Sequence, residues 1–175
     1  MSADDKVIRQ ALGILESRMS GEGMLVASPL SLMRHAYLEL AQEPNEVKLG
    51  YWIGAGNRLL GWDRIAYGGE VSVSYSLRHT ARLAIAAGAT GAFFLHNHPS
   101  GPADPSPADI EASLRMDKYL ASVDVLVLGH FVLAGDTVRE VRSYREFKIT
   151  ESEYSGPRCP HCNWRIEGDV NEHHE

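Results

Sequence analysis

The chain has 175 residues, of which 44% are hydrophobic, enough for one domain with a substantial core. Its formal net charge of −6 argues against sequence-independent nucleic-acid binding, which usually needs a basic face. No stretch approaches the roughly 20 apolar residues of a membrane span, and the polar start MSADDKVIRQ does not resemble a secretion signal. We therefore expect a soluble cytoplasmic protein without a membrane partner.

Helices and strands are both predicted along the chain. In chain order we predict helices over 5–19 and 28–42, strands over 47–53 and 58–67, a helix over 76–88, a strand over 91–96, a helix over 106–122, and two or three strands within 123–144. Val7 and Ile85 fall on the apolar stripes that should face the core. The strand over 91–96 is apolar almost throughout, which indicates burial on both faces. These elements predict a mixed α/β domain.

The composition divides the chain into an N-terminal helical extension (1–27), a folded domain (28–148) and a polar tail (149–175). Both cysteines, Cys159 and Cys162, lie in the tail, so a disulfide framework is not expected. Their CPHC sequence is half of a zinc ribbon, which nearby histidines could complete. We expect a disordered tail, with a second zinc site or a reversible dithiol as alternatives.

Two histidines, His96 and His98, end the apolar strand, and Asp109 follows near the start of the next helix. Residues two apart on a strand point to the same face. Neutral imidazoles and a carboxylate are ligands of catalytic zinc, which keeps one position open for water. Prolines and glycines stiffen the loop between His98 and Ser106, as a precise site requires. The pattern therefore predicts a catalytic metal site.

The same stretch also has a purely structural interpretation. Ser106, Pro107 and Asp109 match a helix N-terminus in which serine is the cap, proline is the first helical residue and the acidic third residue completes a capping box. Each short pattern alone is more often structural than functional. A capping carboxylate is already oriented, however, so Asp109 can serve both purposes. The combination favours the metal site.

The sequence HNHPSGPADPSPAD over 96–109 resembles the JAMM signature of JAB/MPN-domain metalloenzymes, His-x-His followed by Ser-x-x-Asp, and most closely its RadC branch. The resemblance covers about residues 30–145, including EVKLGYWIGAGNRLL and the closing hairpin VDVLVLGHFVLAGD. It implies a JAB/MPN domain with a cytidine-deaminase-like three-layer fold, in which a mixed central sheet is flanked by helices.

The resemblance also assigns roles to individual residues. His96, His98 and Asp109 match the zinc ligands, Ser106 matches a serine that helps to stabilise the oxyanion, and Glu46 matches the general base.

Several positions leave alternatives open or depart from the family pattern. Glu43 competes with Glu46 for the role of base, and neither glutamate stands out without the resemblance. The chain has Gly129-His130 where the family commonly has Asp-His, and Arg78-His79 where it has Arg-Glu. We expect His130 to be a structural histidine, with a position beside the metal site as the alternative.

The implied activity is that of a zinc-dependent hydrolase of the JAMM type, which cleaves a peptide or isopeptide bond in an unidentified protein or peptide. The chain leaves little room for the insertions of ubiquitin-specific JAMM enzymes, so a short chain end or small substrate is expected. Two other classes are a metal-stabilised interaction module without turnover and a DNA-associated protein, as the DNA-repair label of the RadC family implies. The sequence has no helix-turn-helix pattern or basic cluster that supports DNA contact.

Overall fold

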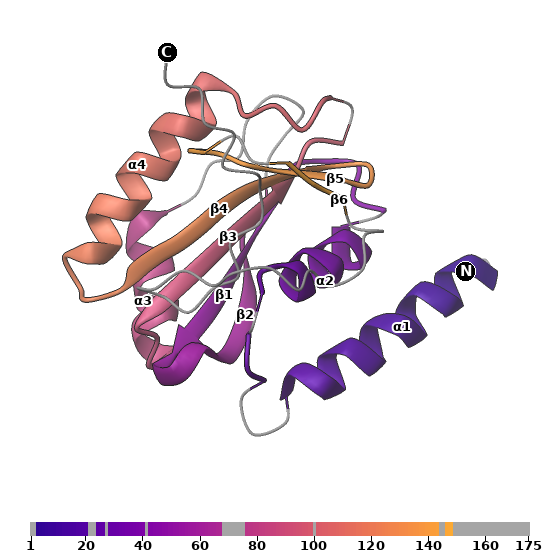
Figure 1. The fold of residues 1–175 in the computed structure, drawn as a ribbon, viewed down its shortest axis with the longest axis horizontal. Coiled ribbons are helices and arrows are strands. Elements are labelled where there is room, and N and C mark those ends of the chain that lie inside the picture. The colour runs from indigo at the N-terminus through magenta and orange to yellow at the C-terminus, as the bar shows by residue number, and fades with distance from the viewer. Residues whose placement is uncertain are drawn as a thin grey trace, which may run out of the picture.

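A computed structural model describes residues 3–20, 24–26, 28–40, 42–67, 76–99, 101–143 and 146–148 (Figure 1). Its elements in chain order are α1 (Ala3–Ser20), α2 (Leu30–Leu40), β1 (Val47–Gly54), a 3₁₀ turn (Ala55–Asn57), β2 (Arg58–Tyr67), α3 (Leu77–Ala87), β3 (Gly91–Asn97), α4 (Pro107–Ala121), β4 (Leu126–Ala134), β5 (Thr137–Glu140) and β6 (Glu146–Lys148). Among the described residues, no helix is both long and apolar enough to cross a membrane.

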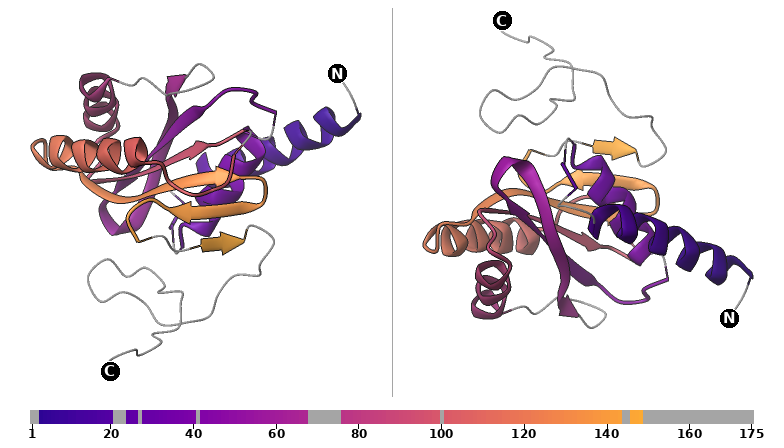
Figure 2. Two further views of the ribbon diagram at one scale, coloured as in Figure 1. Left: turned by 90° about the horizontal axis from the view of Figure 1, so that it is seen from above. Right: turned by 90° about the horizontal axis from the view of Figure 1, so that it is seen from below.

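The strands form one mixed sheet in the order β2-β1-β3-β4-β5-β6. Strands β3 and β4 are parallel, and the other neighbouring pairs are antiparallel. A parallel pair needs a crossover connection, and α4 supplies it between β3 and β4. The edges of the sheet are β2 and β6, which lie far apart in both views of Figure 2.

Helices cover both faces of the sheet and make three layers (Figure 1). On one face, α2 packs its buried side chains against residues of β1, β3 and β4, including Tyr51 and Phe93. On the other face, α3 and α4 enclose a second core with Trp52 and Phe94. Helix α1 contacts α2 and β2 and leaves the central strands to the other helices. The expected mixed sheet flanked by helices is confirmed.

The predicted helices and strands are all found, but two side chains expected in the core are exposed. Val7 is 65% exposed on α1 and Ile85 is 58% exposed on α3. Helix α3 buries Thr80 instead, whose hydroxyl donates a hydrogen bond to the Ser76 carbonyl oxygen at 3.1 Å. A threonine that satisfies its own hydroxyl in this way can take a core position, so the inward stripe is rotated from the purely apolar one.

The predicted tail, with Cys159 and Cys162, lies outside the described residues. The division of the chain at 27 and 148 stays a prediction.

Candidate metal centre

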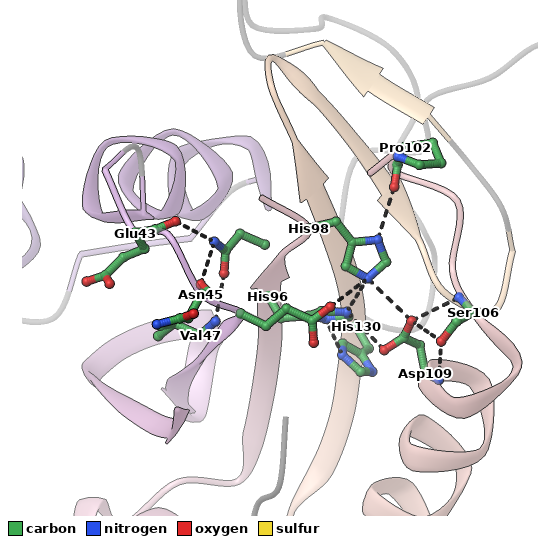
Figure 3. Close-up of polar contacts among 11 residues, drawn as sticks. Glu43, Asn45, Val47, His96, His98, Pro102, Ser106, Asp109 and His130 are labelled. Carbon is green, nitrogen blue, oxygen red and sulfur yellow. Dashed lines mark hydrogen bonds and ion pairs between the residues drawn. The ribbon is translucent and has the colours of Figure 1, made fainter. Parts of the chain in front are cut away.

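His96 and His98 come from the carboxyl end of β3, in the middle of the sheet. Every residue of β3 is buried, and His98 continues the strand by donating its backbone N–H to the Leu133 carbonyl oxygen at 2.8 Å. Both imidazoles face the side of the sheet that α4 covers (Figure 3). Their Nε2 atoms lie 3.2 Å apart. The alternation predicted for the strand therefore brings the two rings together.

Asp109 reaches the histidines from the first turn of α4. Its Oδ1 lies 3.0 Å from His96 Nε2, and its Oδ2 lies 3.5 Å from His98 Nε2. One ligand atom from each of His96, His98 and Asp109 falls within 4.8 Å of the others, as a shared metal ion requires. Figure 3 shows the three side chains turned toward one another. The structure thus brings together the three predicted ligands.

The start of α4 is the capping box that the sequence indicates. Ser106 Oγ accepts a hydrogen bond from the Asp109 backbone N–H at 3.2 Å, and Asp109 Oδ2 accepts from the Ser106 backbone N–H at 2.9 Å. Ser106 Oγ also donates to Asp109 Oδ2 at 2.6 Å. The cap therefore aims the carboxylate at the histidines, so the structural and metal-binding interpretations describe one arrangement. The oxyanion role of Ser106 stays a prediction.

The outer nitrogens of both rings are also engaged, which fixes how the rings are turned. His98 Nδ1–H donates to the Pro102 carbonyl oxygen at 3.0 Å. That bond leaves Nε2 with its lone pair directed at the cluster, as a ligand needs. His96 Nδ1 lies 3.2 Å from Nε2 of His130, which is itself buried on β4. His130 therefore lies beside the candidate metal site, as in the alternative given above.

Burial and hydrogen bonds shift the pKa of all three candidate ligands. Burial lowers the pKa of His96 to about 4, which keeps its imidazole neutral. Burial alone would raise the pKa of Asp109, but hydrogen bonds from His96 and His98 outweigh it and hold that pKa well below its usual range. A hydrogen bond to Asp109, opposed by burial, raises the pKa of His98. A metal ion would displace the protons of these hydrogen bonds, and two imidazoles and a carboxylate are then a fitting donor set for zinc.

The two candidate bases differ clearly in position. Glu46 precedes β1, and its Oε1 lies 3.9 Å from His98 Nε2. Glu43 instead forms a salt bridge with Arg64 of β2, which also binds Glu39 of α2 at 2.6 Å. Figure 3 shows Glu43 turned away from the histidines. Only Glu46 of the two faces the candidate metal site.

Two buried polar residues near the site escaped the sequence analysis. Lys48 of β1 is 2% exposed and pairs with His96 across the sheet. Burial lowers its pKa to about 8, against the opposing effect of Asp109 and Glu46. Asn97 lies between the two histidines and is 5% exposed. A lysine inside the otherwise apolar strand VKLGYWI was a visible signal for Lys48. Asn97 gave no signal of its own, because in the sequence it is only the residue between two motif histidines.

The comparisons with known proteins agree with this geometry. A JAB domain is the class that the fold and the His-His-Asp cluster indicate, and the model of the RadC-like JAB domain family matches residues 26–149. The chain belongs to this family.

Three curated relatives illustrate the similarity, and each is named only as a UPF0758 protein. One from Dechloromonas aromatica is 39% identical over 57% of this chain and 44% of its own length. One from Cupriavidus taiwanensis is 32% identical over 75% of this chain and 60% of its own length. One from Chromohalobacter salexigens is 33% identical over 83% of this chain and 62% of its own length. The chain thus spans about half the length of the curated relatives it matches.

Proposed function

We propose that this chain is a zinc-dependent hydrolase of the JAMM type that cleaves a peptide or isopeptide bond. Membership of the RadC-like JAB family and the His-His-Asp cluster support the metal-dependent part. The observation that carries the catalytic part is the Glu46 carboxylate, 3.9 Å from His98 Nε2 and only partly exposed, while Glu43 is paired with Arg64. A general base must lie within reach of the reacting water, and the position of Glu46 beside His98 supports this role.

In this proposal His96, His98 and Asp109 hold the ion, and a bound zinc ion supplies Lewis-acid chemistry and an activated nucleophile. Glu46 accepts a proton from the attacking water while the water oxygen bonds to the carbonyl carbon. When the C–N bond breaks, protonated Glu46 returns that proton to the leaving amine. The Ser106 hydroxyl, which donates to Asp109 Oδ2 in the structure, would turn to donate its one hydrogen bond to the carbonyl oxygen as negative charge develops there.

The substrate in this proposal is a protein or peptide in the cytoplasm. The net charge of −6 does not favour a polyanion as substrate, because phosphates are bound mainly by clustered lysine and arginine. A short unfolded chain end suits a chain that leaves little room for the insertions of ubiquitin-specific JAMM enzymes.

Replacement of Glu46 by glutamine tests this proposal directly. Zinc-loaded protein is incubated with a peptide library, and mass spectrometry detects the cleaved products. Glutamine has nearly the same shape but cannot accept the proton, so Glu46→Gln should bind stoichiometric zinc and cleave about 10²–10⁴ times more slowly.

Glu43→Gln is the matched control and should keep both zinc and cleavage. An active Glu46→Gln variant beside an inactive Glu43→Gln variant would show that the wrong glutamate has been assigned. Zinc-loaded wild type that cleaves neither peptides nor isopeptide-linked conjugates would favour a metal-stabilised interaction module instead.

A further inference from the structure

Asn97 stands between the two histidines in the chain, but its side chain lies on the opposite side of the strand. It is the last residue of β3 and is almost fully buried. Alternation along the strand turns His96 and His98 toward α4 and turns Asn97 toward the segment that precedes β1. Its amide forms hydrogen bonds with the backbone of Asn45 and Val47, both labelled in Figure 3. Asn97 therefore contacts the backbone that carries Glu46 rather than the metal ligands.

Hydrogen bonds join the Asn97 amide to both sides of Glu46. Oδ1 accepts from the Val47 N–H at 2.7 Å, and Nδ2 donates to the Asn45 carbonyl oxygen at 3.1 Å. A longer contact of 3.5 Å joins Nδ2 to the Glu43 carbonyl oxygen. The Asn45 carbonyl and the Val47 N–H belong to the two peptide groups that flank Glu46. One side chain thus fixes both peptide groups around the candidate base.

The backbone ladder between β1 and β3 does not extend as far as Glu46. Its outermost pair is Lys48 with His96. Beyond that pair, the Asn97 side chain supplies the hydrogen bonds that another step of the ladder would have made. The donor and acceptor roles are unambiguous, because a backbone N–H only donates and a carbonyl oxygen only accepts. An amide is required, since one small side chain must accept on one side and donate on the other.

We propose that Asn97 is a positioning residue for Glu46, whose carboxylate it holds at a fixed place relative to the metal ligands. This inference rests on the proposed function, in which Glu46 is the general base. Its physical basis is that the strand carrying the ligands and the segment carrying the base are joined at this point by the Asn97 amide. A misplacement of about 1 Å can cost about 10²-fold in rate, so the amide affects turnover without touching substrate.

The position of Glu46 can be measured without a substrate. Protein loaded with Co²⁺, a paramagnetic substitute for zinc, is labelled with ¹³C at its glutamate carboxyl groups. Glu46→Gln identifies the Glu46 signal by removing it. In Asn97→Ala we expect stoichiometric Co²⁺, loss of most of the paramagnetic shift of the Glu46 carboxyl carbon, and faster hydrogen exchange at the Val47 amide.

Val127→Ala is the matched control for a general loss of stability. Val127 is a buried core residue of β4 that pairs with Ala92, remote from the His96 end of β3. This variant should be less stable but should keep the Glu46 shift of the wild type. If Asn97 had only a structural role, Asn97→Ala would likewise lower stability but keep the wild-type Glu46 shift.

Asn97→Asp is a second variant of nearly equal size, and it decides the matter if Asn97→Ala does not fold. Aspartate can still accept from the Val47 N–H but cannot donate to the Asn45 carbonyl oxygen, which it would repel. We expect a displaced Glu46 signal with the Val47 amide still protected. An unchanged Glu46 shift in the folded variants would overturn the positioning role.

Turnover gives an independent result where the zinc-loaded protein cleaves peptides. Asn97→Ala should then lower kcat about 10²-fold with little change in KM, whereas a wild-type kcat would count against the proposal. If the wild type cleaves nothing, the proposed function fails, but the Co²⁺ measurement still decides whether Asn97 positions Glu46.

Discussion

His35 and His96 are buried equally on opposite faces of the sheet, at 0% and 1% exposure, and burial lowers the pKa of each to about 4. His35 Nδ1 bonds to the Tyr51 hydroxyl at 2.8 Å, while its Nε2 has no hydrogen-bond partner within the described part of the chain. His96 Nε2 instead meets both Asp109 and His98. Burial and pKa therefore do not separate a structural histidine from a candidate ligand, whereas convergence of donor atoms does.

Removal of the Asp109 carboxylate should have the largest effect on the difference between the two histidines, because His96 would lose its carboxylate partner. We expect Asp109→Ala to lose its zinc on dialysis, since two imidazoles alone supply neither the charge nor the third ligand of a catalytic site. Atomic absorption measures the metal content. Cys159→Ser and Cys162→Ser in the background remove any zinc held by the tail.

His35→Leu is the matched control and should keep its zinc. Undiminished zinc in Asp109→Ala would contradict the assigned ligand set, because the tail cysteines are absent from that background.

Acid titration of the metal-free protein should show what the two histidines have in common. A histidine whose folded-state pKa is about 4 binds fewer protons than its unfolded form, with a pKa near 6.5, so stability falls as the pH falls from about 6.5 to about 4. For His35 the loss is about 3 kcal/mol. His35→Leu should therefore lose about that much less than wild type between pH 7 and pH 4, as urea unfolding measures.

Tyr51 keeps an acceptor in that variant, because its hydroxyl also lies 3.3 Å from the Leu32 carbonyl oxygen. Equal acid sensitivity in wild type and His35→Leu would show that His35 titrates normally.

The smallest effects are expected from alanine replacement of the two helix caps, Ser106 of α4 and Ser76 of α3. Ser76 and Ser106 each accept a hydrogen bond from the backbone N–H of the third helical residue, at 3.3 Å and 3.2 Å. Replacing either by alanine should cost about 0.5–2 kcal/mol, measured by thermal unfolding. Only Ser106→Ala should also weaken zinc binding, by about 10–100-fold, because its hydroxyl orients a candidate ligand.

Ser106→Asn distinguishes capping from catalysis, because asparagine caps a helix but has no hydroxyl. We expect it to be stable and zinc-bound, with slower cleavage of peptides. Cleavage at the wild-type rate would remove the hydroxyl from the mechanism.

Elements and candidate ligands could be predicted because their signals are local. Periodic apolar residues and the Ser106 cap both depend on residues a few positions apart. His96, His98 and Asp109 follow from one short motif, since a strand, a loop and a capped helix fix their relation. The exposure of Ile85 could not be read in this way, because it depends on how α3 is rotated against the sheet.

The choice between Glu43 and Glu46 was not a local question. It depends on Arg64, which lies on β2 and reaches Glu39 and Glu43 only after β1 and β2 have paired. The resemblance favoured Glu46 without a physical reason, and the salt bridge supplies one. Lys48 and Asn97 escaped attention for a similar cause, because their significance comes from the neighbouring strand rather than from their own sequence surroundings.

The connection from β3 through α4 to β4 has a consequence for how the molecule assembles. All three candidate ligands lie between residues 96 and 109, so their meeting closes only a short loop, and the entropy cost of closing a loop grows with its length. Glu46 directly precedes β1, 50 residues before His96, and reaches the site only through long-range sheet pairing. Contacts of this range are the slow ones in folding. The segment with the three candidate ligands is therefore a low-contact-order unit that can form before the sheet brings Glu46 to it.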